Sequence, residues 1–198
     1  VLVSDDSKPT SMHVQKVAKK AHVVLSQVRR AIKLRNSKTL LPIYKSFIRP
    51  LLESSVQAWN PAKADVDTLE KVQKRAVRLM SDQSSRSYED RLSNLQLQSL
   101  EDRRHRGDMI ETFKIIHGHN DVAAEGLFSF VRDRHNKDTR SFAENRLVPE
   151  KSSLDIRKSF FACRVVEGWN RLPLDVRNAP STNAFKNRYD DWIHDLQM

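Results

Sequence analysis

An amphipathic helical pattern dominates the N-terminal part of the chain. Between positions 14 and 32, apolar residues recur at intervals of three and four, which places them on one face of a helix. They are Val14, Val17, Ala18, Ala21, Leu25, Val28 and Ile32. We expect this helix to run from about His13 to Leu34, with Ser11 as its N-cap. With only four glycines in 198 residues, a β-rich barrel is disfavoured, and the sequence predicts a mostly α-helical fold.

Two more helices are expected before residue 82. The first should run from about Thr39 to Trp59, with a kink or break at Pro50, because proline lacks an N–H and its ring clashes with the preceding turn. The second should run from about Val66 to Met80, where apolar residues again keep helical spacing. Together with the first helix they would form a three-helix bundle.

The remainder of the chain also carries helix signals. Ser87 and Ser99 are each followed by an aspartate three residues later, a pattern typical of a helix N-terminus. Gly118 stands where the second of these helices should end. Periodicity is lost over about residues 131–153, which we interpret as an irregular segment or a small hairpin, and Ser181 is expected to cap a last helix. We therefore divide the chain into a basic bundle, residues 1–82, and a mostly helical C-terminal region, residues 83–198.

The positive charge is concentrated in the N-terminal quarter. The chain has a net charge of +10. No Asp or Glu occurs between Ser7 and Leu52, whereas basic residues are frequent there, and the rest of the chain is close to neutral. Solvated helices usually mix both signs, so a block of one sign favours a polyanionic partner, most commonly nucleic acid. The basic residues that we expect to contact phosphates are Lys16, Lys19, Lys20, Arg29, Arg30, Lys33, Arg35, Lys45 and Arg49.

Five motifs in order give the chain a family resemblance. The motifs are LVSDDSKPTSMHVQKVAKKA at residues 2–21, IYKSFIRPLLESSVQAWNP at 43–61, LEKVQKRAVRLM at 69–80, SYEDRLSNLQLQSLEDRRHRGDMIETFKIIHG at 87–118 and LDIRKSFFACRVVEGWNRLPLDVRNAPSTNAFKNRYDDW at 154–192. In this order they are similar to the region after the polymerase palm in reverse transcriptases of LINE-type (non-LTR, CR1/jockey-like) retrotransposons. Each motif alone is weak, but their order over nearly the whole chain is specific.

The resemblance implies that residues 11–80 form the thumb, a helical bundle that holds the template–primer duplex. The chain would then bind RNA–DNA or another duplex without sequence preference and would not be an enzyme by itself, because the palm and its metal-binding carboxylates are missing. An upstream palm or a host protein would be a further partner. The alternative is a fragment recruited by a host as an interaction or structural protein. We expect an intracellular protein, in the nucleus or cytoplasm, with no membrane span and no cofactor.

Several other residues could be read as catalytic or metal-binding, but we consider a structural role the better interpretation for each. Asp5 and Asp6 resemble a catalytic carboxylate pair but lack the third carboxylate upstream. His117 and His119 lack the cysteine or acidic neighbours of a metal site, so we assign no metal. Cys163 lies in an apolar run and is expected in the core.

Two sets of residues remain as secondary candidates for nucleic-acid contact. Acidic neighbours make ion pairing as good an explanation as phosphate contact for one basic cluster, which consists of Arg103, Arg104 and Arg106. Three tryptophans on apolar helix faces are expected to pack in the core rather than stack on bases; they are Trp59, Trp169 and Trp192.

Overall fold

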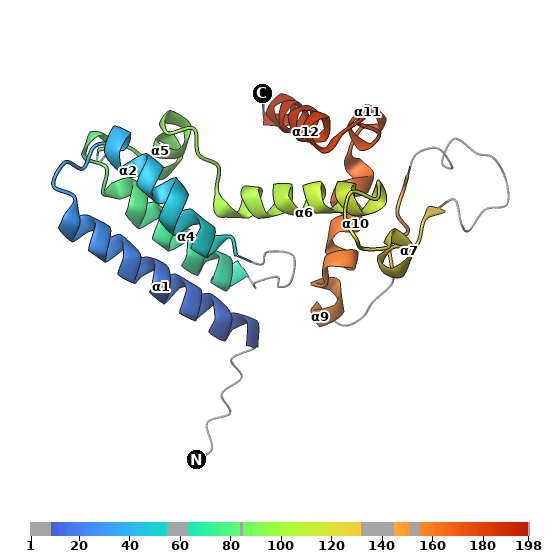
Figure 1. The fold of residues 1–198 in the computed structure, drawn as a ribbon, viewed down its shortest axis with the longest axis horizontal. Helices are drawn as coiled ribbons and strands as arrows, with labels where there is room; N and C mark the ends of the chain where they lie inside the picture. Colours follow the sequence, from blue (N-terminus) through green and yellow to red (C-terminus); the bar gives the residue numbers. More distant parts are fainter. Residues whose placement is uncertain (1–8, 55–62, 84, 132–144, 151–154, 198) are drawn as a thin grey trace, which may run out of the picture. The chain divides into compact units, whose positions relative to one another are not determined.

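The computed structural model describes residues 9–54, 63–83, 85–131, 145–150 and 155–197. The described chain is mostly α-helical, which confirms the predicted fold class (Figure 1). It divides into two compact units, residues 1–104 and 105–198, and the division falls inside a single helix, α6 (Leu100–Ile116).

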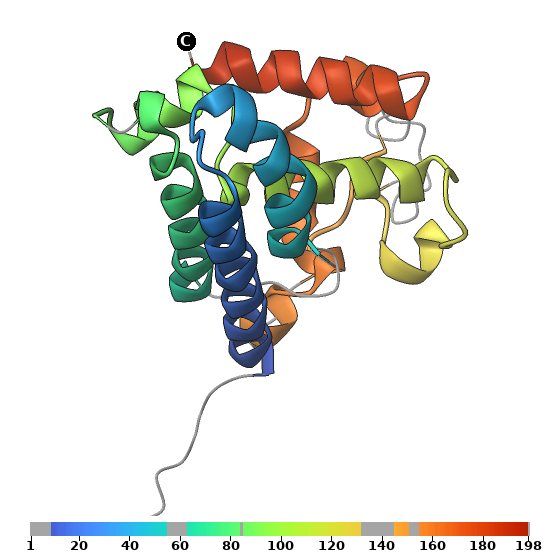
Figure 2. The ribbon, with the colours of Figure 1, turned by 60° about the vertical axis from the view of Figure 1, so that its left-hand side comes forward.

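The first unit is built on two parallel helices, α1 (Pro9–Ala31) and α4 (Lys63–Arg78). At their N-terminal ends, the Ser11 hydroxyl donates a hydrogen bond to the Asp65 carboxylate at 3.0 Å. Ser11 therefore lies inside α1 and is not its N-cap, contrary to the prediction, because the helix begins two residues earlier and Ser11 binds a neighbouring helix instead. The two helices run side by side in both views (Figures 1 and 2).

A third helical segment packs against this pair. It consists of α2 (Ser37–Ile43), a π-helical stretch η1 (Tyr44–Ile48) and α3 (Arg49–Leu52) in direct succession. The predicted kink or break at Pro50 is confirmed in part. The regular α-helix is interrupted by π turns before the proline, and a new α-helical turn begins at Arg49. The segment stays helical through Pro50 because the wider π turns accommodate the missing N–H and the proline ring. The helix ends at Leu52, earlier than the predicted Trp59, and Trp59 itself lies outside the described residues.

The serine caps predicted at Ser87 and Ser99 are confirmed. The Ser87 hydroxyl accepts a hydrogen bond from the Asp90 N–H at 3.1 Å, at the start of α5 (Tyr88–Asn94). The Ser99 hydroxyl does the same for the Asp102 N–H at the start of α6, also at 3.1 Å. A short 3-10 helix, η3 (Ser81–Gln83), lies between α4 and α5.

The core of the first unit extends past the predicted boundary at residue 82. The inward faces of α1 to α4 meet in one cluster that also contains Leu95, Leu97 and Leu100. These leucines follow α5 and begin α6, so their burial adds residues 83–104 to the first unit. The sequence pattern did not indicate this, because the three leucines lie too close to a turn to show helical spacing. The apolar stripe of α1 faces this core as expected, with Val14, Ala18, Ala21 and Leu25 buried. Val17 and Val28 are partly buried against the same core.

The second unit surrounds the remainder of α6 with short helices. They are α7 (Ala124–Leu127), α9 (Asp155–Lys158), α10 (Phe161–Arg171), α11 (Leu174–Arg177) and α12 (Thr182–Gln197). Their core is aromatic: Phe113 stacks on Phe185 with ring centroids 4.5 Å apart, and Trp169 is fully buried beside them.

Gly118 ends α6 as predicted. Its φ is +66°, a conformation that residues with a Cβ rarely adopt. The His119 N–H then donates to the Lys114 carbonyl at 2.7 Å, and the Gly118 N–H donates to the Ile115 carbonyl at 3.2 Å. This hydrogen-bond pair is the Schellman arrangement that glycine favours at helix ends.

The segment predicted to be irregular or a hairpin lies mostly outside the described residues. At its two ends, Phe130 and Leu147 form an isolated antiparallel bridge. The Asn170 side chain holds Leu147 in place, because it accepts from the Leu147 N–H at 2.9 Å and donates to the Leu147 carbonyl at 2.8 Å.

Candidate nucleic-acid interface

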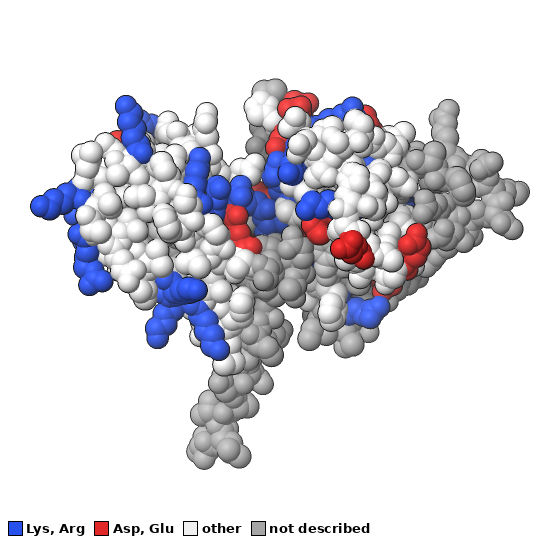
Figure 3. Space-filling model, in the orientation of Figure 1, with Lys and Arg blue, Asp and Glu red and all other residues white. Residues whose placement is uncertain are grey.

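The basic residues of α1 lie outside its buried stripe. The apolar stripe packs into the core of the first unit, so the other positions of the helix remain exposed. Five of the predicted phosphate-binding residues are exposed on this helix, and two more are exposed just after it; they are Lys16, Lys19, Lys20, Arg29, Arg30, Lys33 and Arg35. On the face drawn in Figure 3, the charged side chains along α1 are all Lys or Arg.

These cations are largely uncompensated by the protein. Among the residues that the structure describes, no ion pair involves Lys16, Lys19, Lys20, Arg29, Arg30 or Lys33. The reason is in the sequence, since no acidic residue occurs between Ser7 and Leu52 to pair with them locally. Their mutual repulsion is a cost that an anionic partner would relieve.

The structure separates the last two predicted residues, Lys45 and Arg49, from this group. Both are half-buried on the η1–α3 segment. Arg49 lies 4.0 Å from the carboxylate of Glu53, and Glu53 also binds the Arg103 guanidinium through both of its oxygens. Arg49 therefore already has an anionic neighbour inside the protein, and Lys45 does not line the groove described next.

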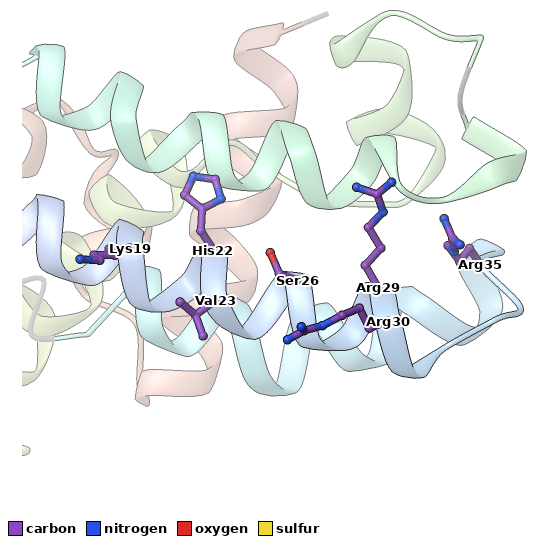
Figure 4. A pocket seen from close by; sticks show the side chains of 7 residues that line it. All are labelled: Lys19, His22, Val23, Ser26, Arg29, Arg30 and Arg35. Atoms are coloured by element: carbon purple, nitrogen blue, oxygen red, sulfur yellow. The ribbon is translucent and has the colours of Figure 1, made fainter.

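An open groove of about 800 Å³ lies along the C-terminal half of α1 (Figure 4). It brings together four predicted residues and three that the sequence did not single out. The lining consists of Lys19, His22, Val23, Ser26, Arg29, Arg30 and Arg35. The His22 and Arg29 side chains point toward the neighbouring helix α4 in Figure 4. None of the lining residues is acidic, so the groove is suited to an anion.

His22 is a titratable residue of the lining whose environment disfavours its charged form. Burial lowers its pKa below the ordinary value of 6.5, and the positive charge of Arg75 on α4 lowers it further. Its Nδ1 atom is buried and has no hydrogen-bond partner among the described residues. The neutral imidazole is therefore favoured at neutral pH, and an anion beside it would favour the cation.

Arg75 is a basic residue of this region that sequence reasoning missed. It is exposed, and within the described part of the chain it forms no ion pair. Because α1 and α4 are parallel, the last turns of the two helices lie near each other: Leu25 and Val28 line the same small cavity as Ala76 and Leu79. The signal was available as Arg75 and Arg78 in the predicted third helix, but its position beside α1 depends on tertiary packing.

The helix dipoles of α1 and α4 offset only part of the positive charge of the arginines at their C-terminal ends. Arg29 and Arg30 lie in the last turn of α1, and Arg75 and Arg78 lie in the last turn of α4. Each helix C-terminus carries about half a negative charge, so two ends together amount to roughly one. Four arginines exceed that requirement severalfold, which leaves a net positive region.

The histidines near the end of α6 have structural roles. His117 Nε2 lies 2.9 Å from the Arg177 carbonyl oxygen, and His119 Nδ1 lies 3.0 Å from the Thr182 hydroxyl. Within the described ranges, no group of three or more His, Cys, Asp or Glu side chains is placed to hold a metal ion. The Asp5–Asp6 pair lies outside the described residues.

The arginines of α6 that were a secondary candidate for nucleic-acid contact are ion-paired or buried within the protein. Arg103 binds Glu53, and Arg106 binds Asp190 through two hydrogen bonds of 2.6 and 2.7 Å. Arg104 is buried, with 9% of its surface exposed. Ion pairing is therefore the interpretation that the structure supports for Arg103 and Arg106.

The remaining candidates are apolar. Trp169 is fully buried, as expected, and Trp192 packs partly buried against the same core. Cys163 is half-buried rather than in the core, because Phe160, at the N-cap of α10, is 61% exposed and that end of the helix faces solvent.

Comparisons with known proteins do not identify a relative of this chain. No protein-family model, no curated protein and no solved structure matches it. In the parts of the chain that the structure describes, no helix is both long enough and apolar enough to cross a membrane.

Proposed function

We propose that this chain is the non-catalytic, nucleic-acid-binding part of a LINE-type reverse transcriptase, and that the exposed basic face of α1 holds the template–primer duplex through its phosphates. The observation that carries the proposal is the row of exposed lysines and arginines on α1 without ion pairs among the described residues. A rigid helix with cations on one side can follow a sugar–phosphate backbone, and such contacts carry no base information. The five ordered motifs favour a reverse transcriptase over other nucleic-acid-binding proteins.

In this proposal the first unit acts as a clamp and supplies no chemistry. Phosphate neutralisation releases counterions from the duplex, which provides most of the binding free energy and makes the affinity depend on salt. An upstream palm would contribute the reaction itself. We expect the chain alone to incorporate no nucleotide on a primed template.

A salt titration of duplex binding tests the proposal. If about four to six cations contact phosphates, the logarithm of the association constant falls against the logarithm of salt concentration with a slope of roughly −4 to −5. The measurement is fluorescence anisotropy with RNA–DNA duplexes of unrelated sequence, which should bind with equal affinity. A slope near zero, or strong preference for one sequence, contradicts a phosphate clamp.

A second arm addresses the alternative of a host-recruited interaction protein. Heparin and a duplex-free acidic protein carry negative charge without the regular phosphate spacing of a duplex. Tighter binding to the acidic protein than to duplex at equal ionic strength would favour that alternative and oppose the clamp.

A further inference from the structure

The groove along α1 contains several kinds of hydrogen-bond donor in addition to its positive charge. Three kinds of donor line it: the guanidinium groups of Arg29 and Arg30, the hydroxyl of Ser26 and the imidazole of His22. The side chains of His22 and Arg29 point toward α4 (Figure 4).

The charges around the groove define the kind of ligand. Lys19, Arg29, Arg30 and Arg35 line it, and Arg75 is close enough to lower the pKa of His22 electrostatically. The guanidinium fork matches the paired oxygens of a phosphate better than it matches a single acceptor, and a hydroxyl can donate to a third oxygen. Val23 is the single apolar residue in the lining.

We infer that this groove is a subsite for one backbone phosphate of the bound nucleic acid, held by Arg29 and Arg30 from α1 and by Arg75 from α4, with His22 as an additional donor at its base. The inference rests on the proposed function and adds to it a specific position on the protein. It also makes α4 part of the interface, whereas the sequence assigned the interface to residues before 50.

His22 gives the subsite a measurable signature. The charged groups near it are all basic: Lys19, Arg29 and Arg30 on its own helix, Arg75 on α4 and Arg35 in the following loop. The other elements packed on α1, which are η1 and α3, contribute Lys45 and Arg49.

Two acidic side chains of α4, those of Asp65 and Glu70, bind groups other than His22. Asp65 accepts from Ser11, and Glu70 accepts from Tyr88 and from the Leu100 N–H. A phosphate in the groove would place a negative charge beside His22 and would favour its protonated form. Binding should then take up a proton, and duplex affinity should rise as the pH falls below about 6.5.

Two pairs of variants of the full chain test the subsite by anisotropy with an RNA–DNA duplex. Arg75→Gln should reduce the magnitude of the salt slope by about 1, because one phosphate contact is lost. The matched control, Arg78→Gln, removes the same charge from an exposed position of the same last turn and should leave the slope unchanged. For His22, the affinity of the unmodified chain should rise by roughly threefold from pH 7.5 to pH 5.5. His22→Gln should abolish that rise, whereas His13→Gln on the same helix should keep it.

The outcomes separate the subsite from the function on which it rests. Steep, sequence-independent binding in which Arg75→Gln behaves like Arg78→Gln, or in which His22→Gln keeps the pH dependence, overturns the subsite and leaves the clamp standing. Absence of duplex binding by the unmodified chain overturns both. Equal losses for heparin and duplex in Arg75→Gln overturn nucleic-acid phosphate as the specific ligand. Circular dichroism melting curves of all four variants should match that of the unmodified chain, since Arg75 is exposed and His22→Gln keeps a polar group in place.

Discussion

The Glu70 carboxylate on α4 accepts a hydrogen bond of 3.0 Å from the backbone N–H of Leu100, the first residue of α6. Its other oxygen accepts from the Tyr88 hydroxyl and, at 3.2 Å, from the Gln73 amide. Gln73 is fully buried and also accepts from the Tyr44 hydroxyl. The Glu70 carboxylate thus joins α4, α5 and the start of α6 within the first unit, and Gln73 extends the network to Tyr44 of η1.

This network predicts a large effect for Glu70→Ala. The substitution removes the acceptor for a backbone N–H and a tyrosine hydroxyl and leaves buried donors unsatisfied, so the free energy of unfolding should fall by about 2–3 kcal/mol. Urea unfolding followed by circular dichroism measures the loss. Asp67→Ala, an exposed acidic position on the same helix, is the control and should change stability by no more than about 0.5 kcal/mol. Equal effects for the two variants would mean that the network contributes little.

Gln96 offers a substitution that should stabilise the chain. It has a φ of +50° at the end of α5, and the Leu97 N–H donates to the Leu92 carbonyl across it, as at Gly118. Because glycine adopts this conformation without a Cβ clash, Gln96→Gly should raise the free energy of unfolding by about 0.5–1 kcal/mol. Gln98→Gly, two residues later in the same loop, should give no such gain. A destabilised Gln96→Gly variant would contradict the assigned backbone conformation.

Two bidentate Arg–Asp pairs in the second unit differ mainly in burial, which makes them a matched experiment. Arg164 binds Asp108 through two bonds of 2.8 Å, with side chains 12% and 9% exposed. Arg106 binds Asp190 with side chains 24% and 43% exposed.

Asp108→Ala leaves a buried guanidinium without its counter-charge and should cost about 3–5 kcal/mol. Asp190→Ala should cost at most about 1 kcal/mol, since solvent can hydrate the more exposed arginine. Thermal unfolding of the two variants should therefore separate them clearly. Similar melting temperatures would show that burial does not govern the strength of these pairs.

Asp82 predicts a pH dependence with a defined sign. Its carboxylate accepts from the Ser37 hydroxyl at 2.5 Å and from the Ser37 N–H at 2.9 Å, at the first turn of α2, and these bonds lower its pKa below the ordinary 3.8. A carboxyl group whose pKa is lower in the folded state stabilises the fold above its unfolded pKa. That contribution is lost as the pH falls below about 3.8.

Asp82→Asn should therefore cost about 0.5–1 kcal/mol at pH 7, a value kept small because the group is exposed. The difference from the unmodified chain should disappear as the pH is lowered from 4 toward 2. Urea unfolding at stepped pH values measures it. A difference that persists unchanged at the lowest pH would rule out the charge of Asp82 as its cause.

The elements that local sequence specifies were predicted well. The apolar stripe of α1, the Ser87 and Ser99 caps and the Gly118 terminus each depend on residues within a few positions, and each is confirmed. Ser11 failed as a cap because its partner, Asp65, lies 54 residues away. Pro50 interrupts the regular α-helix as predicted but does not end the helical segment, because the π-helical stretch before it accommodates a proline, which spacing alone does not reveal.

The candidate interface was predicted in part for the same reason. Charge counting identified the basic residues of α1, because an acid-free segment is visible in the sequence. It could not show that Arg49 already has Glu53 beside it, or that Arg75 lies beside His22, since both facts depend on which helices are neighbours. The three leucines that extend the first core past residue 82 escaped notice for the same reason.

The most direct test of the central proposal is duplex binding by a charge-reversal variant of α1 and the turn after it. Lys16, Lys20, Arg30 and Lys33 are exposed. Replacing all four with glutamate should abolish RNA–DNA duplex binding at physiological salt, because phosphate contacts supply nearly all non-specific affinity. The fold should survive, since exposed substitutions shift stability by about 0.5 kcal/mol each. Circular dichroism checks this.

The control makes the same charge change at four exposed positions outside the interface: Arg86, Lys158, Arg171 and Arg188. Arg103, Arg104 and Arg106 are unsuitable as controls, because Arg103 and Arg106 form partly buried ion pairs and Arg104 is buried. Arg171 is also paired, with Glu167, but that pair is at the surface, with side chains 71% and 77% exposed, and contributes little to stability. The account predicts that the α1 variant loses binding and that the control keeps it within a few-fold. Retained binding by a folded α1 variant, together with loss in the control, would contradict the account and place the interface elsewhere on the chain.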